Sequence, residues 1–246
     1  MKTMLERVTV TGADDSVDPK DLVEISEDFP FVEWGVLLSP TRYGTPRFPS
    51  KSWMEDLLQE VINAKIERDF RTKLSGHLCG KFVRKICDGY PSFMYENTDI
   101  ISLFKRMQLN FHGHPFVNNM SVSYLNELLH FFPYQWIFQI DGVNDNLLKW
   151  AVEDGVDAVG LYDRSHGAGV LPSEWPEKEN YYCGYAGGLS VDNLSDELEK
   201  IYESCRGEPI WIDAETHLRS EDDSVFDLDK VCDFLRIASF WVKDTG

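Results

Sequence analysis

The chain has 246 residues, with 24 Lys and Arg against 42 Asp and Glu, so its formal net charge is 24 − 42 = −18. Hydrophobic residues make up 43% and charged residues 27% of the chain, which excludes wholesale disorder. The negative charge argues against nucleic acids and anionic membranes as partners, because like charges repel at long range. We therefore expect a small-molecule ligand, and nothing in the sequence predicts the oligomeric state.

Compartment signals are weak but agree with one another. The first 15 residues, MKTMLERVTVTGADD, lack an apolar secretory core, and no run approaches the roughly 18 to 20 apolar residues of a membrane span. The cysteines are odd in number and contain no CxxC pair, which favours reduced thiols over a disulfide framework or a zinc ribbon. They are Cys79, Cys87, Cys183, Cys205 and Cys232. We expect a cytoplasmic protein.

Short β-rich runs alternate with helical patterns from end to end. The predicted strands cover 7–12, 31–39, 72–80, 106–113, 135–142, 158–163, 180–188 and 209–215. Most end in Gly, Asp, Ser or His, which is typical of a strand that opens into a loop. Apolar residues at helical spacing predict helices over 18–29, 52–66, 121–132, 144–155, 190–205 and 227–241. Segment 81–105 is longer than a simple helix and is expected to hold an extra turn.

Eight such repeats predict an α/β fold with a parallel sheet covered by helices, and this chain length favours a single (β/α)8 TIM barrel over a doubly wound sheet. No linker or composition shift marks a second domain, so 1–246 is expected to be one domain. The C-terminal strand ends of a barrel carry its chemistry. The polar residues expected there are Thr11, Ser39, Arg42, His77, Cys79, His112, Asp141, Asp163, Gly187, Gly188, Asp213, Glu215 and His217.

Several of these strand ends resemble phosphoribosylanthranilate isomerase, the tryptophan-pathway enzyme that converts an aminoaldose phosphate into an aminoketose. The run LLSPTRYG is similar to that family's Ser-x-x-Arg after an apolar strand, and QLNFHG resembles its QLHG. LYDRSHGAGVLPSEW, YAGGLSVDNL and WIDA are similar to its sixth, seventh and eighth strand ends. The resemblance covers most of the chain in the right order and implies the barrel fold.

The resemblance also implies roles for individual residues. Asp163 matches the general acid that protonates the ring oxygen as a furanose opens. Arg42, three residues after Ser39, matches the arginine that holds the substrate's carboxylate. Gly187 and Gly188 match the loop whose backbone N–H groups bind phosphate. Each residue also has a purely structural interpretation, as a loop cap, a surface arginine or a strand-to-loop turn.

Two departures from the family's pattern affect the expected reaction. Thr11 stands where the family has its general-base cysteine, and a threonine hydroxyl is too weak an acid to serve unaided as a base near neutral pH. The eighth-strand loop carries Glu215 and His217 where the family completes its phosphate site, and a carboxylate there repels a phosphate dianion. Either Arg219 rebuilds an anion site or the ligand carries no phosphate, and we favour the second alternative.

Three functional hypotheses remain open. The leading one is a diverged barrel enzyme that isomerises a small polar or sugar-derived metabolite, with Asp163 as the acid and His112, Asp141 or Asp213 as the base. The second is an inactive barrel that binds a ligand or a protein. The third is a metal-dependent hydrolase or isomerase with ligands among His77, His112, Asp141, Glu215 and His217. We expect neither a cofactor nor a metal under the leading hypothesis.

Overall fold

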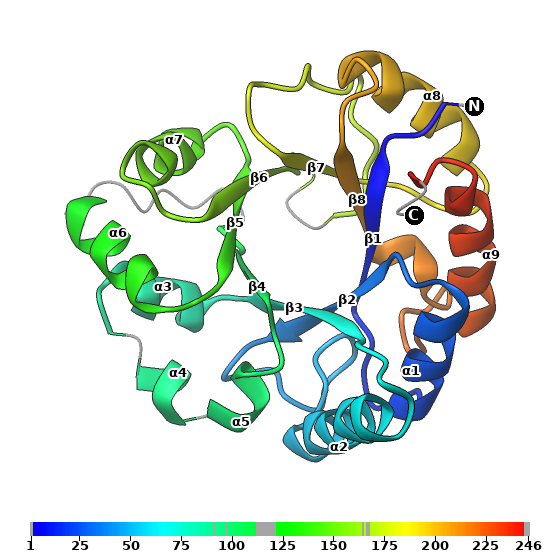
Figure 1. Cartoon of the computed structure of the whole chain (residues 1–246), viewed down its shortest axis with the longest axis horizontal. Coiled ribbons are helices and arrows are strands. Elements are labelled where there is room, and N and C mark those ends of the chain that lie inside the picture. Colours follow the sequence, from blue (N-terminus) through cyan, green and yellow to red (C-terminus); the bar gives the residue numbers. More distant parts are fainter. Residues whose placement is uncertain are drawn as a thin grey trace.

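The computed structural model describes residues 2–90, 92–96, 98–111, 122–163, 165 and 168–243. Eight parallel strands close into a barrel in chain order (Figure 1). They are β1 Leu5–Thr11, β2 Val32–Leu38, β3 Lys73–Leu78, β4 Arg106–Leu109, β5 Gln135–Ile140, β6 Ala158–Tyr162, β7 Cys183–Ala186 and β8 Ile210–Ala214. Pairing of β1 with β8 closes the sheet. The predicted (β/α)8 barrel is confirmed.

Helices surround the barrel and cover the outer face of the sheet (Figure 1). They are α1 Pro19–Asp28, α2 Lys51–Arg68, α3 Lys81–Cys87, α4 Ser92–Glu96, α5 Thr98–Ile101, α6 Val122–Phe131, α7 Asp145–Glu153, α8 Leu194–Ser204, the 3-10 helix η2 Thr216–Leu218 and α9 Leu228–Ser239. The uneven segment before β4 divides into α3, α4 and α5. The described part of the connection from β6 to β7 contains no helix.

The main core lies between the sheet and these helices. Leu22 of α1, Leu57 of α2 and Phe234 of α9 are buried in one cluster with the apolar side chains of the strands. Burial of such side chains supplies most of the favourable free energy of folding. Among the described residues, no helix is both long enough and apolar enough to cross a membrane.

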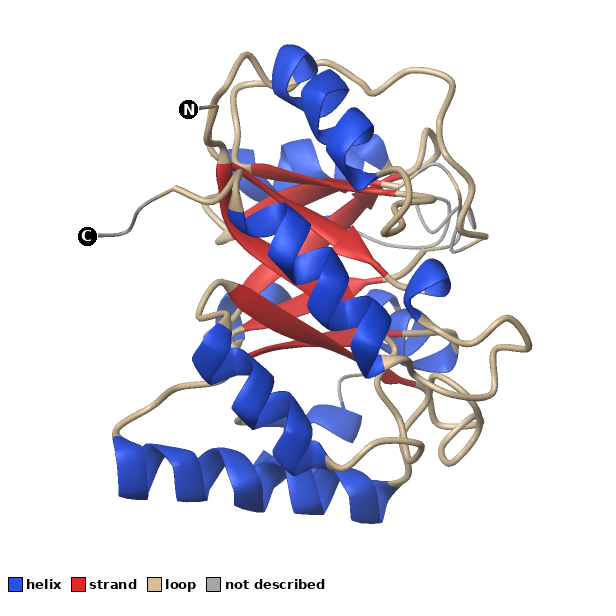
Figure 2. Ribbon diagram, turned by 90° about the vertical axis from the view of Figure 1, so that its right-hand side faces the viewer, coloured by secondary structure: helices blue, strands red, loops and turns tan. Residues whose placement is uncertain are grey.

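The two ends of the barrel are built differently. Figure 2 shows both chain termini at one end and the loops that follow the strands at the other. At the terminal end, Leu5 forms a parallel bridge with Val242, and the Met4 N–H donates to the Trp241 carbonyl at 2.9 Å. The C-terminal segment therefore packs beside the start of β1, and the opposite end is left to the loops after the strands.

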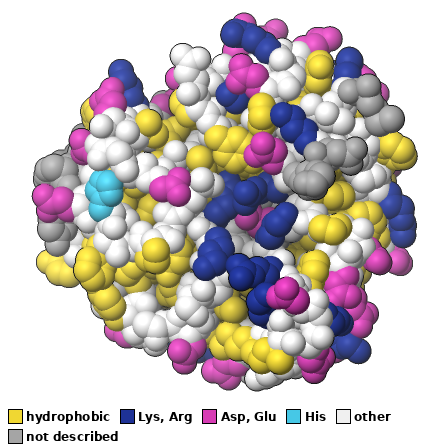
Figure 3. Space-filling view, viewed as in Figure 1, with side chains coloured by type: hydrophobic (Ala, Val, Ile, Leu, Met, Phe, Trp, Pro, Cys, Tyr) yellow, Lys and Arg dark blue, Asp and Glu magenta, His cyan; other side chains and the backbone are white. Residues whose placement is uncertain are grey.

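An ionic cluster fills the barrel interior at the N-terminal ends of the strands. Arg7 and Arg106 each donate from Nη1 to the buried Glu33 carboxylate at 2.8 Å. Burial alone would raise the pKa of Glu33, but the charges of Arg106 and Arg7 hold it below its ordinary value. Figure 3 views the molecule from this N-terminal end of the barrel and shows Lys and Arg side chains gathered around the centre. The net charge of −18 is therefore not spread evenly over the molecule.

Candidate active site at the C-terminal end of the barrel

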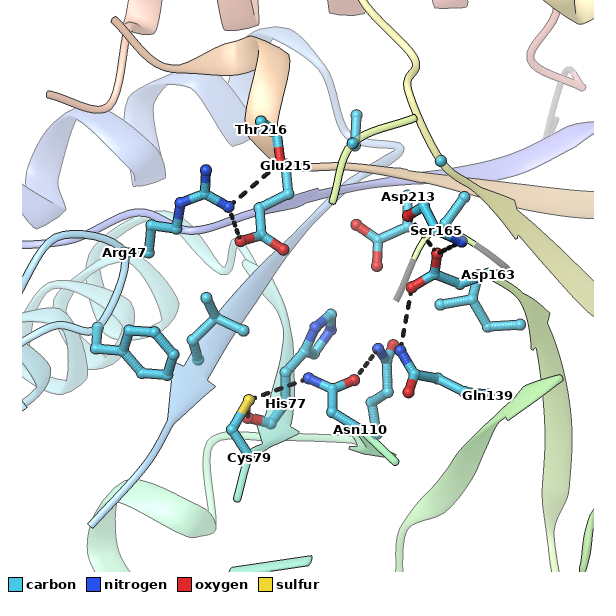
Figure 4. A pocket seen from close by; sticks show the side chains of 18 of the residues that line it. Arg47, His77, Cys79, Asn110, Gln139, Asp163, Ser165, Asp213, Glu215 and Thr216 are labelled. Atoms are coloured by element: carbon cyan, nitrogen blue, oxygen red, sulfur yellow. Dashed lines mark hydrogen bonds and ion pairs between the residues drawn. The ribbon is translucent and has the colours of Figure 1, made fainter. Parts of the chain in front are cut away.

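A cavity of about 540 Å³ lies among the C-terminal ends of the strands and the loops that follow them. Figure 4 shows part of its lining, which comes from segments far apart in the sequence. The lining includes ten of the residues predicted from the sequence: Ser39, Arg42, His77, Cys79, Asp163, Gly187, Gly188, Asp213, Glu215 and His217. The barrel therefore brings most of the expected polar ring to one cavity.

Asp213 lies on the cavity wall near the end of β8 and is 7% exposed. The Thr11 hydroxyl, which lies behind the wall, donates to Asp213 Oδ1 at 2.8 Å. Burial raises the pKa of Asp213 well above its ordinary value, and the charges of Glu215 and Asp163 raise it further, although the hydrogen bond from Thr11 opposes them. These influences shift Asp213 toward its protonated form, in which a carboxyl group can donate a proton.

Asp163 follows β6 on the same cavity and is also 7% exposed, but it has different partners. Its carboxylate accepts hydrogen bonds from Gln139 Nε2 at 3.1 Å, from the Ser165 N–H at 3.1 Å and from Ser165 Oγ at 2.7 Å (Figure 4). The described hydrogen bonds of Asp213 come from one donor, Thr11. Two carboxyl groups thus share one cavity in unlike surroundings.

His77 of β3 is a third buried titratable group on the cavity wall, with Nε2 3.0 Å from Ser75 Oγ. Burial lowers the pKa of His77 to about 4, so the imidazole is neutral at pH 7. Gly35 of β2, which is paired with Ser75, lies beside the His77 ring. A Cβ at Gly35 would lie 2.2 Å from Thr11 Oγ1 and 2.9 Å from the His77 ring. Glycine therefore lets Thr11 and His77 approach each other inside the barrel.

Amide side chains line the floor of the cavity, and the sequence analysis missed them. Gln108 Nε2 donates to Asn110 Oδ1 at 2.5 Å, and Asn110 Nδ2 donates to Cys79 Sγ at 3.1 Å. Polar residues at alternate positions of an otherwise apolar strand, as in MQLN and FQID, are the available signal, because alternate side chains share one face. That signal would have found Gln108, Asn110 and Gln139.

Cys79 lies on the same wall but is not a reactive thiol. Burial raises the pKa of Cys79 to about 12, so the sulfur stays protonated near neutral pH and is a poor nucleophile. All five cysteines of the chain are free, as the odd count and wide spacing predict. The titratable groups of the lining that remain for acid and base chemistry are its carboxyl groups and the imidazoles of His77 and His217.

The candidate base Asp141 is not part of the described lining. Asp141 follows β5, but its Oδ1 accepts hydrogen bonds from the N–H groups of Val143 and Asn144 at 2.9 Å, and its Oδ2 accepts one from Asn144 Nδ2 at 3.0 Å. These bonds shape the turn in front of α7. His112 lies outside the described residues.

The loop after β6 fills the space beside the predicted anion loop. A Cβ at Gly188, where φ is +68°, would lie 2.4 Å from the backbone nitrogen of Leu171. On the other side of the loop, a Cβ at Gly169 would lie 2.8 Å from Thr216, and His217 Nε2 is 2.9 Å from the Gly169 carbonyl oxygen. The loop thus packs against both segments that the resemblance associates with phosphate binding.

The two arginines considered for anion binding are placed very differently. Arg42 lines the cavity and is exposed, with its guanidinium carbon 4.1 Å from the centre of the Phe48 ring. Arg219 is buried behind the wall, where Nη1 donates to the Gly12 carbonyl at 2.5 Å and Nη2 donates to Asp14 Oδ2 at 2.7 Å. Arg219 therefore does not rebuild an anion site at the cavity surface.

The metal hypothesis gains no geometric support from the described residues. Within them, no group of three or more His, Cys, Asp and Glu side chains is arranged to hold a metal ion. Of the expected ligands, His77 and His217 lie close to hydrogen-bonding partners within the protein, Ser75 Oγ and the Gly169 carbonyl.

Comparisons with known proteins identify the fold. No protein-family model and no curated protein sequence matches the chain. Among solved structures, it is similar to phosphoribosylanthranilate isomerase from Thermotoga maritima, with 13% identity and a TM-score of 0.54. That alignment covers 95% of this chain and 98% of the other. It is also similar to phosphoribosylanthranilate isomerase from Pyrococcus furiosus, with 12% identity and a TM-score of 0.54, over 97% of this chain and 99% of the other. This chain has a phosphoribosylanthranilate isomerase-like barrel fold. A phospho-2-dehydro-3-deoxyheptonate aldolase from Thermotoga maritima is also similar, at 7% identity and a TM-score of 0.52 over 98% and 71%. At these identities the likeness concerns the fold alone.

Proposed function

We propose that this protein is a barrel enzyme that isomerises a small polar or sugar-derived metabolite by acid/base catalysis. The observation that carries the proposal is the pair of carboxyl groups on one cavity, Asp163 and Asp213, which differ in their hydrogen-bond partners. Such a pair is the usual arrangement by which one site supplies both an acid and a base. The cavity is also of the size that holds small ligands.

The surroundings suggest which carboxyl does what. In an isomerisation of the aldose–ketose type, a base takes the proton from the carbon next to a carbonyl group while an acid protonates the carbonyl oxygen. Asp213, whose pKa burial raises well above its ordinary value, supplies the proton to oxygen. Asp163 takes the carbon proton and returns it to the neighbouring carbon, and Asp213 is reprotonated by the adjacent hydroxyl group as that group becomes the new carbonyl. Thr11 acts as a positioning residue for Asp213.

This assignment reverses the role that the resemblance implies for Asp163. In the resembling family the carboxyl after the sixth strand is the acid, and the base comes from the end of the first strand. Here the first strand ends in Thr11, whose hydroxyl is bound to Asp213. Because Asp213 on β8 is the acid in this assignment, Asp163 after β6 acts as the base.

The packing around Gly188 supports a ligand without a phosphate group. The backbone of Leu171 lies against Gly188, and His217 and Thr216 lie against Gly169, so this loop lies where a phosphate would have to enter. Arg219 is bound inside the wall. We therefore expect an unphosphorylated substrate.

The test is proton exchange in D2O. The protein is incubated with unphosphorylated aldoses, ketoses and amino sugars, and exchange at the carbon next to the carbonyl group is followed by proton NMR. We expect one of these classes of sugar to exchange the proton on that carbon for deuterium. We expect Asp213→Asn and Asp163→Asn each to slow this exchange at least about 100-fold. Asp141→Asn is the matched control, since Asp141 binds the turn before α7 and should keep the wild-type rate.

Two results would contradict the proposal. Exchange that is unchanged in both Asp213→Asn and Asp163→Asn would remove the carboxyl pair from the reaction, and the absence of exchange with every class would favour the ligand-binding alternative. Isomerisation of phosphoribosylanthranilate by the wild-type protein would show that Thr11 does not disable the parent reaction and that a phosphate fits.

A further inference from the structure

Arg47, in the connection between β2 and α2, is held in place through its backbone. Its φ of 72° lies in the left-handed region, which a non-glycine residue seldom adopts. Its backbone N–H donates to Asp14 Oδ2 at 2.6 Å, which ties this connection to the loop after β1. The side chain is 17% exposed and belongs to the cavity lining. The fold therefore fixes where this guanidinium meets the cavity.

The donors of Arg47 are directed at the segment that follows β8. Nη1 donates to Glu215 Oε1 at 2.8 Å and to Thr216 Oγ1 at 3.2 Å, as Figure 4 shows. Nε lies 2.9 and 2.8 Å from the two carboxylate oxygens of Asp223. The Glu215 side chain is 26% exposed and lines the cavity itself. A carboxylate of the protein thus occupies a place beside Arg47 that a ligand anion would otherwise take.

A second arginine completes this group of charges, which we name the Arg47 cluster: Asp14, Arg47, Glu215, Arg219 and Asp223. Arg219, whose side chain is fully buried, donates to Asp223 Oδ1 at 2.6 Å and to Asp14 Oδ2 at 2.7 Å. Two guanidinium groups face three carboxylates, so the formal charge of the cluster is 2 − 3 = −1. Without Glu215 the sum becomes 2 − 2 = 0, and the cluster no longer carries a net negative charge that repels an oxyanion.

We propose that Glu215 is an internal counter-ion that determines the charge of the ligand. The part of the ligand that lies against this wall is uncharged, as a hydroxyl or carbonyl group is, because an anion there would meet the Glu215 carboxylate. Removal of that carboxylate turns the part of the cavity wall beside Arg47 into a binding site for a small oxyanion, the ligand to which a guanidinium group is best matched. This inference rests on the proposed function only in taking the same cavity as the ligand site.

The remaining contacts keep Arg47 in position when Glu215 is changed. Asp14 binds its backbone, and Asp223 binds its Nε. The variant Glu215→Gln therefore alters the charge of the wall while leaving the rest of the cluster paired. Glu215→Ala additionally opens space beside the guanidinium group.

The experiment measures binding of inorganic sulfate by isothermal titration calorimetry at constant ionic strength. We expect Glu215→Gln or Glu215→Ala to bind sulfate at least about tenfold more tightly than the wild-type protein, which corresponds to about 1.4 kcal/mol. Adding Arg47→Gln to the better binder should remove the gain. The matched control is Glu208→Gln, which also removes one negative charge, but from an exposed carboxylate that pairs with Lys178. It should bind sulfate as the wild type does.

Other outcomes overturn the inference. Wild-type protein that binds sulfate as tightly as Glu215→Gln does would show that the carboxylate excludes nothing. A lack of gain in both Glu215 variants, when their circular dichroism and melting temperatures match the wild type, would show that Arg47 is no anion site. A gain that survives Arg47→Gln would place the anion elsewhere. Sulfate binding requires no turnover, so a failure of the isomerase proposal in D2O leaves this measurement decisive.

Discussion

The Thr11 hydroxyl on the first strand donates a 2.8 Å hydrogen bond to Asp213 on the eighth, across the pairing that closes the barrel. The two residues are 202 positions apart in the sequence. The contact explains how a threonine can stand where the resembling family has a reactive cysteine. In the proposed mechanism its hydroxyl does not take a proton itself, because it orients the buried carboxyl group of Asp213, the proposed acid.

Thr11→Val keeps the shape of the side chain and removes the donor. We expect the free energy of unfolding to fall by about 1 kcal/mol, which is typical of a lost buried hydrogen bond. The pKa of Asp213 should rise further, because the hydrogen bond from Thr11 lowers it. Urea denaturation measures the first effect and carbon-13 NMR of the carboxyl groups measures the second. Thr11→Ser keeps the hydroxyl and should stay close to the wild type in both, whereas an unchanged titration in Thr11→Val would contradict the role of the contact.

Gly35→Ala tests the close approach of Thr11 and His77. The added Cβ would lie 2.2 Å from Thr11 Oγ1, so we expect the free energy of unfolding to fall by about 1 to 3 kcal/mol, as overpacking of a core does. The double variant Gly35→Ala with Thr11→Ala removes the closest of the clashing atoms, Thr11 Oγ1, and leaves the contact with the His77 ring. It should lose clearly less stability than the sum of the two single variants, and strict additivity in urea denaturation would argue against the predicted clash.

His77 should make stability depend on pH below neutrality. The pKa of His77 in the folded protein is about 4, below its ordinary value of 6.5, so between these values the unfolded chain binds more protons. Stability is therefore lost as the pH falls from 6.5 toward 4. From pH 7 to pH 5, we expect the wild type to lose about 2 kcal/mol more than His77→Gln does. Equal losses in urea denaturation at the two pH values would show that His77 is accessible to water.

Gly188→Ala separates backbone strain from packing against the loop after β6. Gly188 and Gly155 both have positive φ, +68° and +80°, but only Gly188 has backbone atoms of another segment within 3 Å of its would-be Cβ. Both substitutions should suffer the left-handed strain of about 1 kcal/mol. We expect Gly188→Ala to cost about 2 kcal/mol more in thermal unfolding, because the Leu171 backbone must move. Equal costs would mean that the loop does not press on Gly188.

The sequence predicts the barrel because its signals are local. Apolar β-rich runs followed by loop residues place the strand ends, so Thr11 and Asp213 were correctly expected at the C-terminal end of the barrel. The resemblance carries the same information, since its motifs lie at those ends. The agreement of strand pattern and motif order made the fold predictable without a close relative.

The roles of the site residues depend on contacts that no local pattern contains. Asp141 in FQIDG and Asp163 in GLYDR look alike as carboxyl groups that end a strand. The residues after Asp141 form a turn that binds its carboxylate, whereas Asp163 meets Gln139 and Ser165 on the cavity. The ion pair between Arg47 and Glu215 could not be predicted from a local pattern either, because the two residues are 168 positions apart in the sequence.

The central claim is that Asp213 carries a proton that it can give to a ligand, and carbon-13 NMR of the aspartate carboxyl groups tests it most directly. We predict a carboxyl signal that titrates well above the ordinary Asp value of about 3.9. It should be absent in Asp213→Asn, and it should move to lower pH in Asp163→Asn, because the charge of Asp163 contributes to raising the pKa. An Asp213 signal that titrates near the ordinary value would contradict the assignment of Asp213 as the acid.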